Sequence, residues 1–307
     1  MKIVFMGTPD FAVPALRALI AAGHQVTLVV TQSDKPQGRH QTLTPPPVKV
    51  CAVENGIPVF QPQSLKTAEN IAHITAENPD VIVVVAYGKI LPKELLDYPP
   101  YGAVNVHASL LPKYRGAAPI QWCILNGDTV TGVTTMQMDE GLDTGDMLLT
   151  STREIPDDMT AGELFDALCD DGAKLLCQTL DGLQAGTLKP TPQDNDQATY
   201  VSVLSKAQSP LDFSKPAATL HNQVRGLHPW PVATCQIGDV TVKIHKTAVG
   251  GETTAAFGTV IATSPLTVAC GDGRSLIIEE LQYPAAKRMS AAAFLCGHDL
   301  PIGTVLK

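Results

Sequence analysis

The segment VIVVVAYG, at residues 81–88, restricts the possible folds more than any other part of this sequence. It begins with an uninterrupted apolar run, whereas a strand with one face in water alternates apolar and polar residues. An unbroken run is typical of a parallel strand that is covered on both of its faces. The segments at residues 2–7, 26–31 and 103–109 (KIVFMG, VTLVVT and AVNVHAS) are also strand-like.

Helical patterns separate these strands. Residues 13–23 and 67–77 have helical character, and residues 160–184 form a long amphipathic pattern. Strands that alternate with helices predict an α/β fold with an open, mostly parallel sheet. The strand-like segments 131–138 and 147–155 lie close together in the sequence, so we expect them to form an antiparallel pair.

The pattern changes after about residue 186, where the chain becomes polar and proline-punctuated. One helix candidate follows at 215–227, and after it come short alternating segments with glycine-rich turns, which suggest a small β-barrel. A chain of 307 residues is long enough for two domains. We therefore predict a first domain over 1–190, a linker over 191–206 and a second domain over 207–307.

The charge of the chain limits its partners. The net charge of −8 argues against indiscriminate nucleic-acid binding. Residues 1–206 carry 14 Lys and Arg against 23 Asp and Glu, a net charge of −9, whereas residues 207–307 carry 8 against 7, a net charge of +1. A phosphate backbone would therefore meet the second domain, or local patches on the first.

The cysteines and the apolar runs indicate a cytoplasmic protein. The seven cysteines are scattered, form no C-x-x-C pair and have no histidine cluster near them, which argues against a structural zinc site or a disulfide framework. No apolar run approaches the length that crosses a bilayer. Gly7 and Pro9 interrupt the first apolar stretch, so we expect a buried strand there rather than a signal peptide.

The stretch NVHASLLP, at residues 105–112, places an amide and an imidazole where a ligand could meet them. Residues two apart on a strand share a face, so Asn105 and His107 point the same way. The chain then breaks at Pro112, and ligands of open α/β sheets bind beyond the carboxyl ends of strands. A histidine near a strand end is more often structural, and that alternative stays open at this point.

Two further motifs bear on the chemistry. GTPDFA, at 7–12, follows the first strand, but it lacks the glycines of a G-x-G-x-x-G turn, which argues against a dehydrogenase. DEGLDTGD, at 139–146, holds four carboxylates and two glycines between two strands. Its spacing does not fit an EF-hand calcium loop. Two interpretations remain: a solvated acidic turn, or a loop that faces the end of the 103–108 strand and brings Asp143 to His107.

An Asn-His-Asp set suggests acyl transfer. Asn105 and His107 can donate hydrogen bonds to an oxygen that gains negative charge, and Asp143 can orient the imidazole and help to move protons. Ser109 lies just after the strand, but its neighbours do not form a nucleophile elbow. Direct transfer to an incoming nucleophile is therefore favoured over an acyl-enzyme.

The block NVHASLLPKYRGAAP followed by DEGLDTGD resembles the folate-dependent formyltransferases. The opening MKIVFMGTPDFAVPAL, the segment YGKILP at 87–92 and the segment NQVRGLHPWPVAT at 222–234 resemble those members that act on methionyl initiator tRNA, and the likeness covers nearly the whole chain. The resemblance implies a Rossmann-like formyltransferase domain followed by an OB-like β-barrel domain that helps to hold tRNA. It further implies transfer of a formyl group from 10-formyltetrahydrofolate, as co-substrate, to the α-amine of the esterified methionine, without a metal.

Carried over residue by residue, the resemblance assigns roles to three sets of side chains. The catalytic set is Asn105, His107 and Asp143. The folate-binding set is Ser109, Leu110, Leu111 and Pro112, together with Ile90, Leu91, Asp139, Glu140, Gly141 and Leu142 around the pterin. The residues expected to contact tRNA are Lys35, Arg39 and His40 in the loop at 34–47, followed by Lys206, Arg225, Lys243 and Lys246.

Several alternatives stay open. A related formyltransferase could use the same three residues on another amine, such as glycinamide ribonucleotide or an amino sugar nucleotide, and a hydrolase could use water. A non-catalytic RNA-binding protein is the alternative from another class, although binding alone does not need Asn105, His107 and Asp143. We expect a cytoplasmic monomer whose partners are initiator methionyl-tRNA and the folate, with no membrane association.

Overall fold

A computed structural model describes residues 1–38 and 41–307. The chain divides into two compact units, which are described separately. The first unit comprises Met1–Gly116, Thr131–Arg153 and Phe165–Val201, and the second comprises Ala117–Val130, Glu154–Leu164 and Ser202–Lys307. None of the helices in these described ranges is long and apolar enough to cross a membrane.

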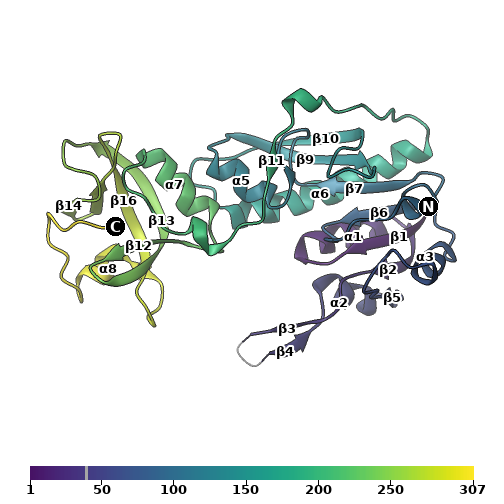
Figure 1. Ribbon diagram of the computed structural model, residues 1–307, viewed down its shortest axis with the longest axis horizontal. Coiled ribbons are helices and arrows are strands. Elements are labelled where there is room, and N and C mark those ends of the chain that lie inside the picture. The colour runs from purple at the N-terminus through teal and green to yellow at the C-terminus, as the bar shows by residue number, and fades with distance from the viewer. Residues whose placement is uncertain (39–40) are drawn as a thin grey trace. The chain divides into compact units, whose positions relative to one another are not determined.

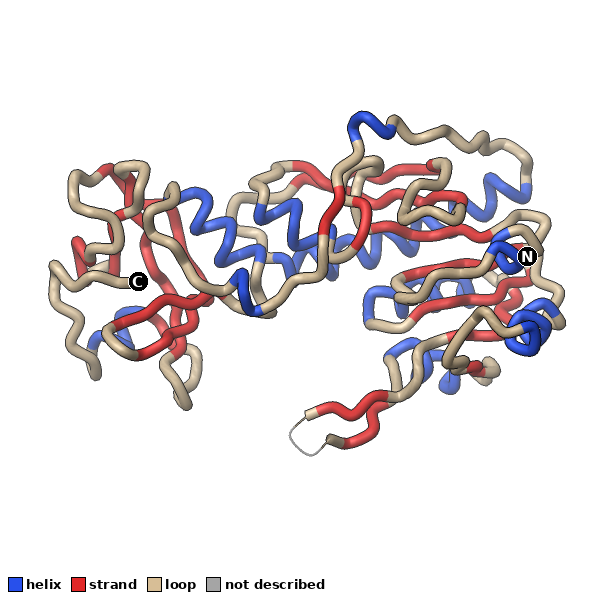
Figure 2. The backbone as a smooth tube through the Cα atoms, in the orientation of Figure 1, coloured by secondary structure: helices blue, strands red, loops and turns tan. Residues whose placement is uncertain are grey.

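The first unit is built on one large sheet, which Figure 2 shows as a layer of strands with helices against it. Within the described residues this sheet has seven strands in the order β10-β9-β7-β6-β1-β2-β5. The strands from β7 to β5 run parallel to one another, and β9 runs antiparallel to β7. The predicted α/β fold with a mostly parallel sheet is confirmed.

Up to Val201, strands and helices alternate along the chain as predicted. The strands are β1 (Lys2–Gly7), β2 (Gln25–Val30), β3 (Lys35–Gln37), β4 (Thr42–Thr44), β5 (Val59–Phe60), β6 (Val81–Val85), β7 (Ala103–His107), β8 (Arg115–Gly116), β9 (Val130–Gln137), β10 (Met147–Glu154) and β11 (Tyr200–Val201). The helices are α1 (Val13–Ala21), α2 (Pro47–Glu54), α3 (Ala68–Thr75), α4 (Lys93–Leu96), α5 (Pro119–Leu125) and α6 (Ala161–Gln184), with 3₁₀ turns η1 (Asp10–Ala12) and η2 (Asn195–Gln197).

The central strands are buried on both faces, as their apolar runs predict. All residues of β6 are buried, and Ile82 and Val84 pack in one hydrophobic cluster with residues of β1 and β2. Helix α6 covers β7 and β9: a Cβ on Gly172 would lie 3.0 Å from Val106 Cγ1, and Thr179 shares a hydrogen bond of 2.7 Å with Thr135 of β9. The packed faces therefore leave the ends of the strands as the places where polar side chains can meet a ligand.

The carboxyl ends of three parallel strands meet at one edge of this sheet. Thr8 Oγ1 and Gln32 Nε2, which follow β1 and β2, both donate to the carbonyl of Tyr87, which follows β6, at 3.1 and 2.9 Å. Strands β3 and β4 form an antiparallel hairpin after β2, drawn in purple in Figure 1. The contacts at Thr8 therefore fix the edge from which this hairpin leaves.

The second unit is an antiparallel sheet domain, and the short alternating segments form its strands. The closed barrel that these segments suggest stays a prediction. Its described sheet has the order β12-β13-β16-β15-β14, with β17 paired to β16. Its strands are β12 (Ala233–Ile237), β13 (Val240–Glu252), β14 (Val260–Thr263), β15 (Leu266–Ala269), β16 (Arg274–Gln282) and β17 (Met289–Ser290), and its helical elements, besides α5, are η3 (Lys206–Gln208), α7 (Ala217–Gly226) and α8 (Ala291–Leu295). One cluster of buried residues, including Leu220 of α7 and Phe294 of α8, forms its core.

Candidate active site

Asn105 and His107 lie on β7, near its carboxyl end. Both side chains are buried, with exposures of 8% and 7%. Asn105 pairs with Val84 of β6 and Met136 of β9, so it is held from both sides of the strand. Among the described residues none hydrogen-bonds to the Asn105 side-chain amide. A buried amide without an internal partner is available to a bound ligand.

The ring of His107 is oriented by the backbone. His107 Nε2 lies 2.9 Å from the carbonyl oxygen of Tyr114. Since a carbonyl oxygen only accepts, Nε2 must carry the hydrogen of this bond. In the neutral ring, Nδ1 is therefore the nitrogen without a hydrogen.

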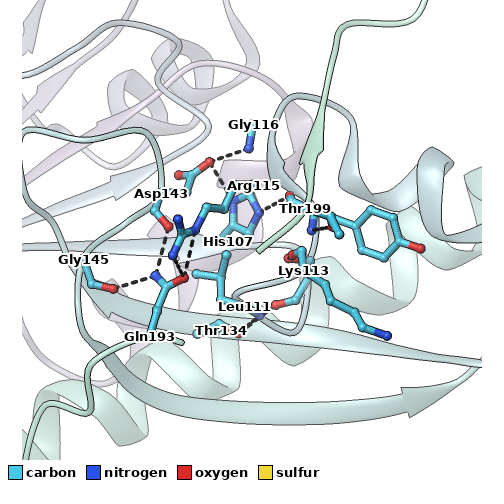
Figure 3. A network of polar contacts seen from close by, with 12 residues as sticks. His107, Leu111, Lys113, Arg115, Gly116, Thr134, Asp143, Gly145, Gln193 and Thr199 are labelled. Atoms are coloured by element: carbon cyan, nitrogen blue, oxygen red, sulfur yellow. Dashed lines mark hydrogen bonds and ion pairs between the residues drawn. The ribbon is translucent and has the colours of Figure 1, made fainter. Parts of the chain in front are cut away.

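Asp143 faces the Nδ1 atom of His107. Its Oδ2 lies 3.7 Å from His107 Nδ1, and the two side chains are 15% and 7% exposed. The same oxygen accepts a hydrogen bond of 2.8 Å from the backbone N–H of Gly116 (Figure 3). The structure thus brings Asp143 to His107, while the hydrogen bond that orients the ring comes from Tyr114.

The loop of Asp143 reaches this position by a route that the sequence analysis did not foresee. In the antiparallel pairing, Val104 lies opposite Gln137 and His107 lies opposite Thr134. The loop therefore leaves β9 beside the start of β7, about 10 Å along the strand from His107, and it folds back over the sheet. Gly145 permits the return, because a Cβ there would lie 1.7 Å from the Gln137 carbonyl oxygen.

The segment Ser109–Pro112 is fixed to β9. Thr134 Oγ1 donates to the Ser109 carbonyl at 2.7 Å and accepts from the Leu111 N–H at 3.2 Å. Ser109 is fully buried and its Oγ donates to the Lys113 carbonyl at 2.6 Å. Ser109 is thus a structural hydroxyl of this loop, in agreement with the absence of a nucleophile elbow around it.

The two segments predicted around the pterin differ in exposure. Ile90 is 79% exposed, whereas Leu91 is buried in the same cluster as Tyr87, and Met138 packs against that cluster. Leu142 is 60% exposed, and Asp139 Oδ1 closes its own loop by accepting from Thr144 Oγ1 at 2.6 Å. The remaining predicted residues, Glu140 and Gly141, are exposed in this loop.

Electrostatics link these two segments. Lys93 follows Ile90 and Leu91, and its pKa is raised by the hydrogen bond to Asp97 and, more weakly, by the charge of Glu140. Burial raises the pKa of Tyr87 to about 12, so this phenol stays neutral. Ile90 and Leu142 are thus the exposed apolar side chains of the two segments.

A cavity of about 300 Å³ lies where β1 and β2 end. It is lined by Thr8, Pro9, Asp10, Ser33, Lys35, Thr44, Pro45, Pro46 and Pro47. Lys35 is exposed, and its Nζ donates to Gln32 Oε1 at 2.8 Å. Arg39 and His40, which were also predicted to contact tRNA, lie outside the described residues.

The other predicted tRNA contacts lie in the second unit and differ in environment. Lys206, Lys243 and Lys246 are exposed, and Lys246 pairs with Glu279 at 3.1 Å. Arg225 is only 6% exposed, and its Nη1 donates to two backbone carbonyls of the same unit. Burial lowers the pKa of this guanidinium. The three lysines present charge to solvent, whereas Arg225 is used inside the fold.

The described residues contain no group of three or more His, Cys, Asp or Glu side chains that could hold a metal ion. The polar groups near His107 are hydrogen-bond donors beside a carboxylate. Asn105 and His107 form one donor pair on a rigid strand, and Asp143 forms the adjacent anionic group. Such an arrangement suits a carbonyl group that develops negative charge on its oxygen.

The known proteins that this chain is similar to are formyltransferases. The profile described as "Formyl transferase" matches residues 1–180, and the profile described as "Formyl transferase, C-terminal domain" matches residues 203–299. The chain is 52% identical to the methionyl-tRNA formyltransferase of Trichlorobacter lovleyi, over 99% of this chain and 96% of that protein. It is 49% identical to that of Acetivibrio thermocellus, over 100% and 99%.

Solved structures show the same fold. An N-formyltransferase from Helicobacter canadensis, in complex with folinic acid and dTDP-3-aminofucose, superposes with a TM-score of 0.69 at 21% identity, over 92% of this chain and 99% of that one. A glycinamide ribonucleotide transformylase from Symbiobacterium toebii superposes with a TM-score of 0.51 at 16% identity, over 63% and 93%. Its matching profiles and its full-length relatives show that the chain belongs to the formyl transferase family.

Proposed function

We propose that this protein transfers the formyl group of 10-formyltetrahydrofolate to the α-amine of methionine esterified to initiator tRNA. The observation that carries the reaction class is that the His107 ring lies 3.7 Å from the Asp143 carboxylate, on the same strand as Asn105, whose amide has no hydrogen-bond partner in the part of the chain that the structure describes. The choice of acceptor rests on relatives that are about half identical over their whole length and are named for it.

The donors act on the formyl oxygen. When the neutral amine attacks the formyl carbon, the carbonyl oxygen becomes negatively charged. Asn105 donates to it from its amide, and His107 donates from Nδ1 as the imidazolium, because Nε2 is committed to the Tyr114 carbonyl. Buried donors that are already oriented stabilise this charge without reorganisation, and losing one costs about 10²–10³ in rate.

Asp143 has two tasks in this scheme. Its carboxylate stabilises the imidazolium form of His107, which is the form that donates. It also lies where it can accept the proton that the attacking nitrogen must lose, and can return it to the folate nitrogen that leaves. The bond between the formyl carbon and that nitrogen breaks as the new amide forms, so the products are formylmethionyl-tRNA and tetrahydrofolate.

The folate would be held by the segments around this centre. Ser109–Pro112 form a fixed loop against β9, and exposed Ile90 and Leu142 offer apolar surface to the pterin. We assign residues 1–190 to this catalytic domain, 191–206 to the linker and 207–307 to a domain that helps to hold tRNA.

The tRNA would be positioned by charge. Lys35 lies beside the cavity at the end of β2, and Lys206, Lys243 and Lys246 present amines on the second unit. A register shift in β13 between Ile244 and Lys246 places Lys246, like Lys243, on the exposed side. Phosphate contacts of this kind position a nucleic acid without reading its sequence.

The test is a formylation assay with 10-formyltetrahydrofolate and charged initiator tRNA. We expect turnover that depends on the tRNA and that falls about 10²–10³-fold in His107→Ala, while folate binding by the variant survives. His73→Ala, an exposed histidine on α3 of the same unit, is the matched control and should keep its rate.

Each alternative has its own outcome in this assay. Formyl release without tRNA would identify a hydrolase. Transfer to an amino sugar nucleotide or to glycinamide ribonucleotide, but not to tRNA, would identify another acceptor. The absence of turnover under every condition would overturn the enzymatic assignment and leave a binding protein.

A further inference from the structure

The position of Asp143 needs an explanation, because the direction in which β9 ends does not lead to His107. Its loop leaves β9 beside Val104 and must fold back toward His107. Asp143 itself has a φ of 54°, in the left-handed region that a residue with a side chain adopts at a cost of about 1–3 kcal/mol. A loop held in such a conformation requires contacts from outside itself.

Those contacts come from Gln193, in the segment between α6 and β11. Its side-chain amide donates to the carbonyl of Asp143 at 2.9 Å and to the carbonyl of Gly145 at 2.7 Å (Figure 3). Both of its amide hydrogens therefore bind carbonyl groups of the loop that carries Asp143. Gln193 is 9% exposed, so water does not easily replace it.

Arg115 fixes Gln193 in turn. Its Nε and Nη2 donate to Gln193 Oε1 at 3.0 and 2.8 Å, and the same guanidinium donates to Asn195 Oδ1 at 2.8 Å and to the hydroxyl of Tyr200 at 3.0 Å. Arg115 is 1% exposed. Because a guanidinium only donates and backbone carbonyls only accept, the Gln193 amide can take one orientation.

The hold extends to the carboxylate through the next residue. Arg115 and Gly116 form β8, which pairs with β11, and the Gly116 N–H donates to Asp143 Oδ2 at 2.8 Å. The element that orients Gln193 thus also binds the side chain of Asp143. We name Arg115 and Gln193, with the hydrogen bonds between them and those of Gln193 to Asp143 and Gly145, the loop clamp.

We propose that Gln193 is a positioning residue for the transfer reaction, which holds Asp143 against His107 through the loop clamp. This inference rests on the role of Asp143 in the proposed function. Gln193 acts through the backbone of the loop, because its amide donates to the carbonyls of Asp143 and Gly145. A displacement of about 1 Å in a catalytic group can cost about 10²-fold in rate.

The test uses Gln193→Glu in the full-length protein. Glutamate keeps the size of the side chain and an acceptor for Arg115, but it removes both donors and places a carboxylate against two carbonyl oxygens. We expect kcat for formylation to fall about 10²-fold, with little change in the KM for the charged tRNA. Gln197→Glu, the same exchange on an exposed residue of this segment, is the matched control and should stay within about twofold.

A double-mutant cycle with Asp143→Asn separates positioning from general damage. If Gln193 acts through Asp143, Gln193→Glu lowers kcat by less than about threefold once Asp143 is already Asn. Equal losses in both backgrounds would overturn the inference, as would an unchanged kcat in the single variant. If Asp143→Asn alone keeps the wild-type rate, the proposed role of Asp143 fails instead, and a wild-type protein that forms no formylmethionyl-tRNA would refute the proposed function, so the failures are distinct.

The folded state of each variant is measured by urea unfolding, monitored by circular dichroism. Should Gln193→Glu not fold, Gln193→Met supplies the second reading, because it removes the same two donors with an uncharged side chain of similar length. The same loss of kcat and the same loss of additivity are expected of it. A Met variant with the wild-type rate would overturn the inference.

Discussion

Replacing Asp143 by Asn tests whether its charge matters apart from its shape. The Asn side chain has the same size, and its oxygen can still accept from the Gly116 N–H, which Asp143 Oδ2 does now at 2.8 Å. What disappears is the negative charge that lies 3.7 Å from His107 Nδ1. The variant therefore removes support for the imidazolium while it keeps the loop in place.

The expected magnitude follows from Coulomb's law at that separation. Two unit charges 3.7 Å apart interact by about 4.5 kcal/mol at an effective dielectric constant of about 20, and by about 1.1 kcal/mol in bulk water. With exposures of 7% and 15%, the pair lies nearer to the first condition. Since each 1.36 kcal/mol or so is tenfold in rate, kcat/KM should fall by about 10²–10³.

The assay is steady-state formylation of charged initiator tRNA at saturating 10-formyltetrahydrofolate. Asp146→Asn is the matched control: it removes a charge from the same loop, and the Asp146 carboxylate has no hydrogen-bond partner among the residues described. The control should keep its rate within about twofold. A loss of less than about threefold in Asp143→Asn would refute the idea that this carboxylate supports the imidazolium.

Two further predictions concern stability. Arg225→Ala should lower the free energy of unfolding by about 2–4 kcal/mol in urea titrations, because it removes a buried side chain that donates to the carbonyl of Met159 and, together with the Met159 N–H, to the carbonyl of Pro156. The Thr160 N–H and hydroxyl donate to the Glu163 carboxylate and lower its pKa below the ordinary 4.5. This stabilisation is present at neutral pH and disappears as the pH falls through the folded-state value, so Glu163→Gln should cost up to about 1 kcal/mol at pH 7 and progressively less below pH 4.5.

The layers of the fold follow from residue patterns alone. The apolar run at Val81–Val85 predicts a strand covered on both faces, and the structure buries every one of these residues. The alternation of strands and helices predicts the parallel sheet in the same way. These features depend on how many apolar side chains must leave water, which a sequence records directly.

The site was less accessible to such reasoning. The i and i+2 spacing of Asn105 and His107 predicts one shared face, but it does not predict that β9 runs antiparallel to β7 in a register that opens the Asp143 loop at the opposite end. The acceptor for His107 is a main-chain carbonyl, which no residue type reveals. The polar, proline-punctuated composition around Gln193 predicts a linker. The role of Gln193 depends on a contact with Arg115, 78 positions away, which local composition does not reveal.

The main-chain anchor of the imidazole has an evolutionary consequence. Side chains can be deleted by a codon change, but the carbonyl oxygen of position 114 is present whatever amino acid is encoded there. Mutational drift at this position is filtered by backbone shape instead, because Tyr114 has a φ of 61°, where glycine and asparagine are the easiest replacements. In a saturation library at codon 114, activity should therefore be retained chiefly by variants whose residue 114 can adopt this positive φ. In those variants His107 should keep its hydrogen on Nε2, because the carbonyl that accepts it is unchanged.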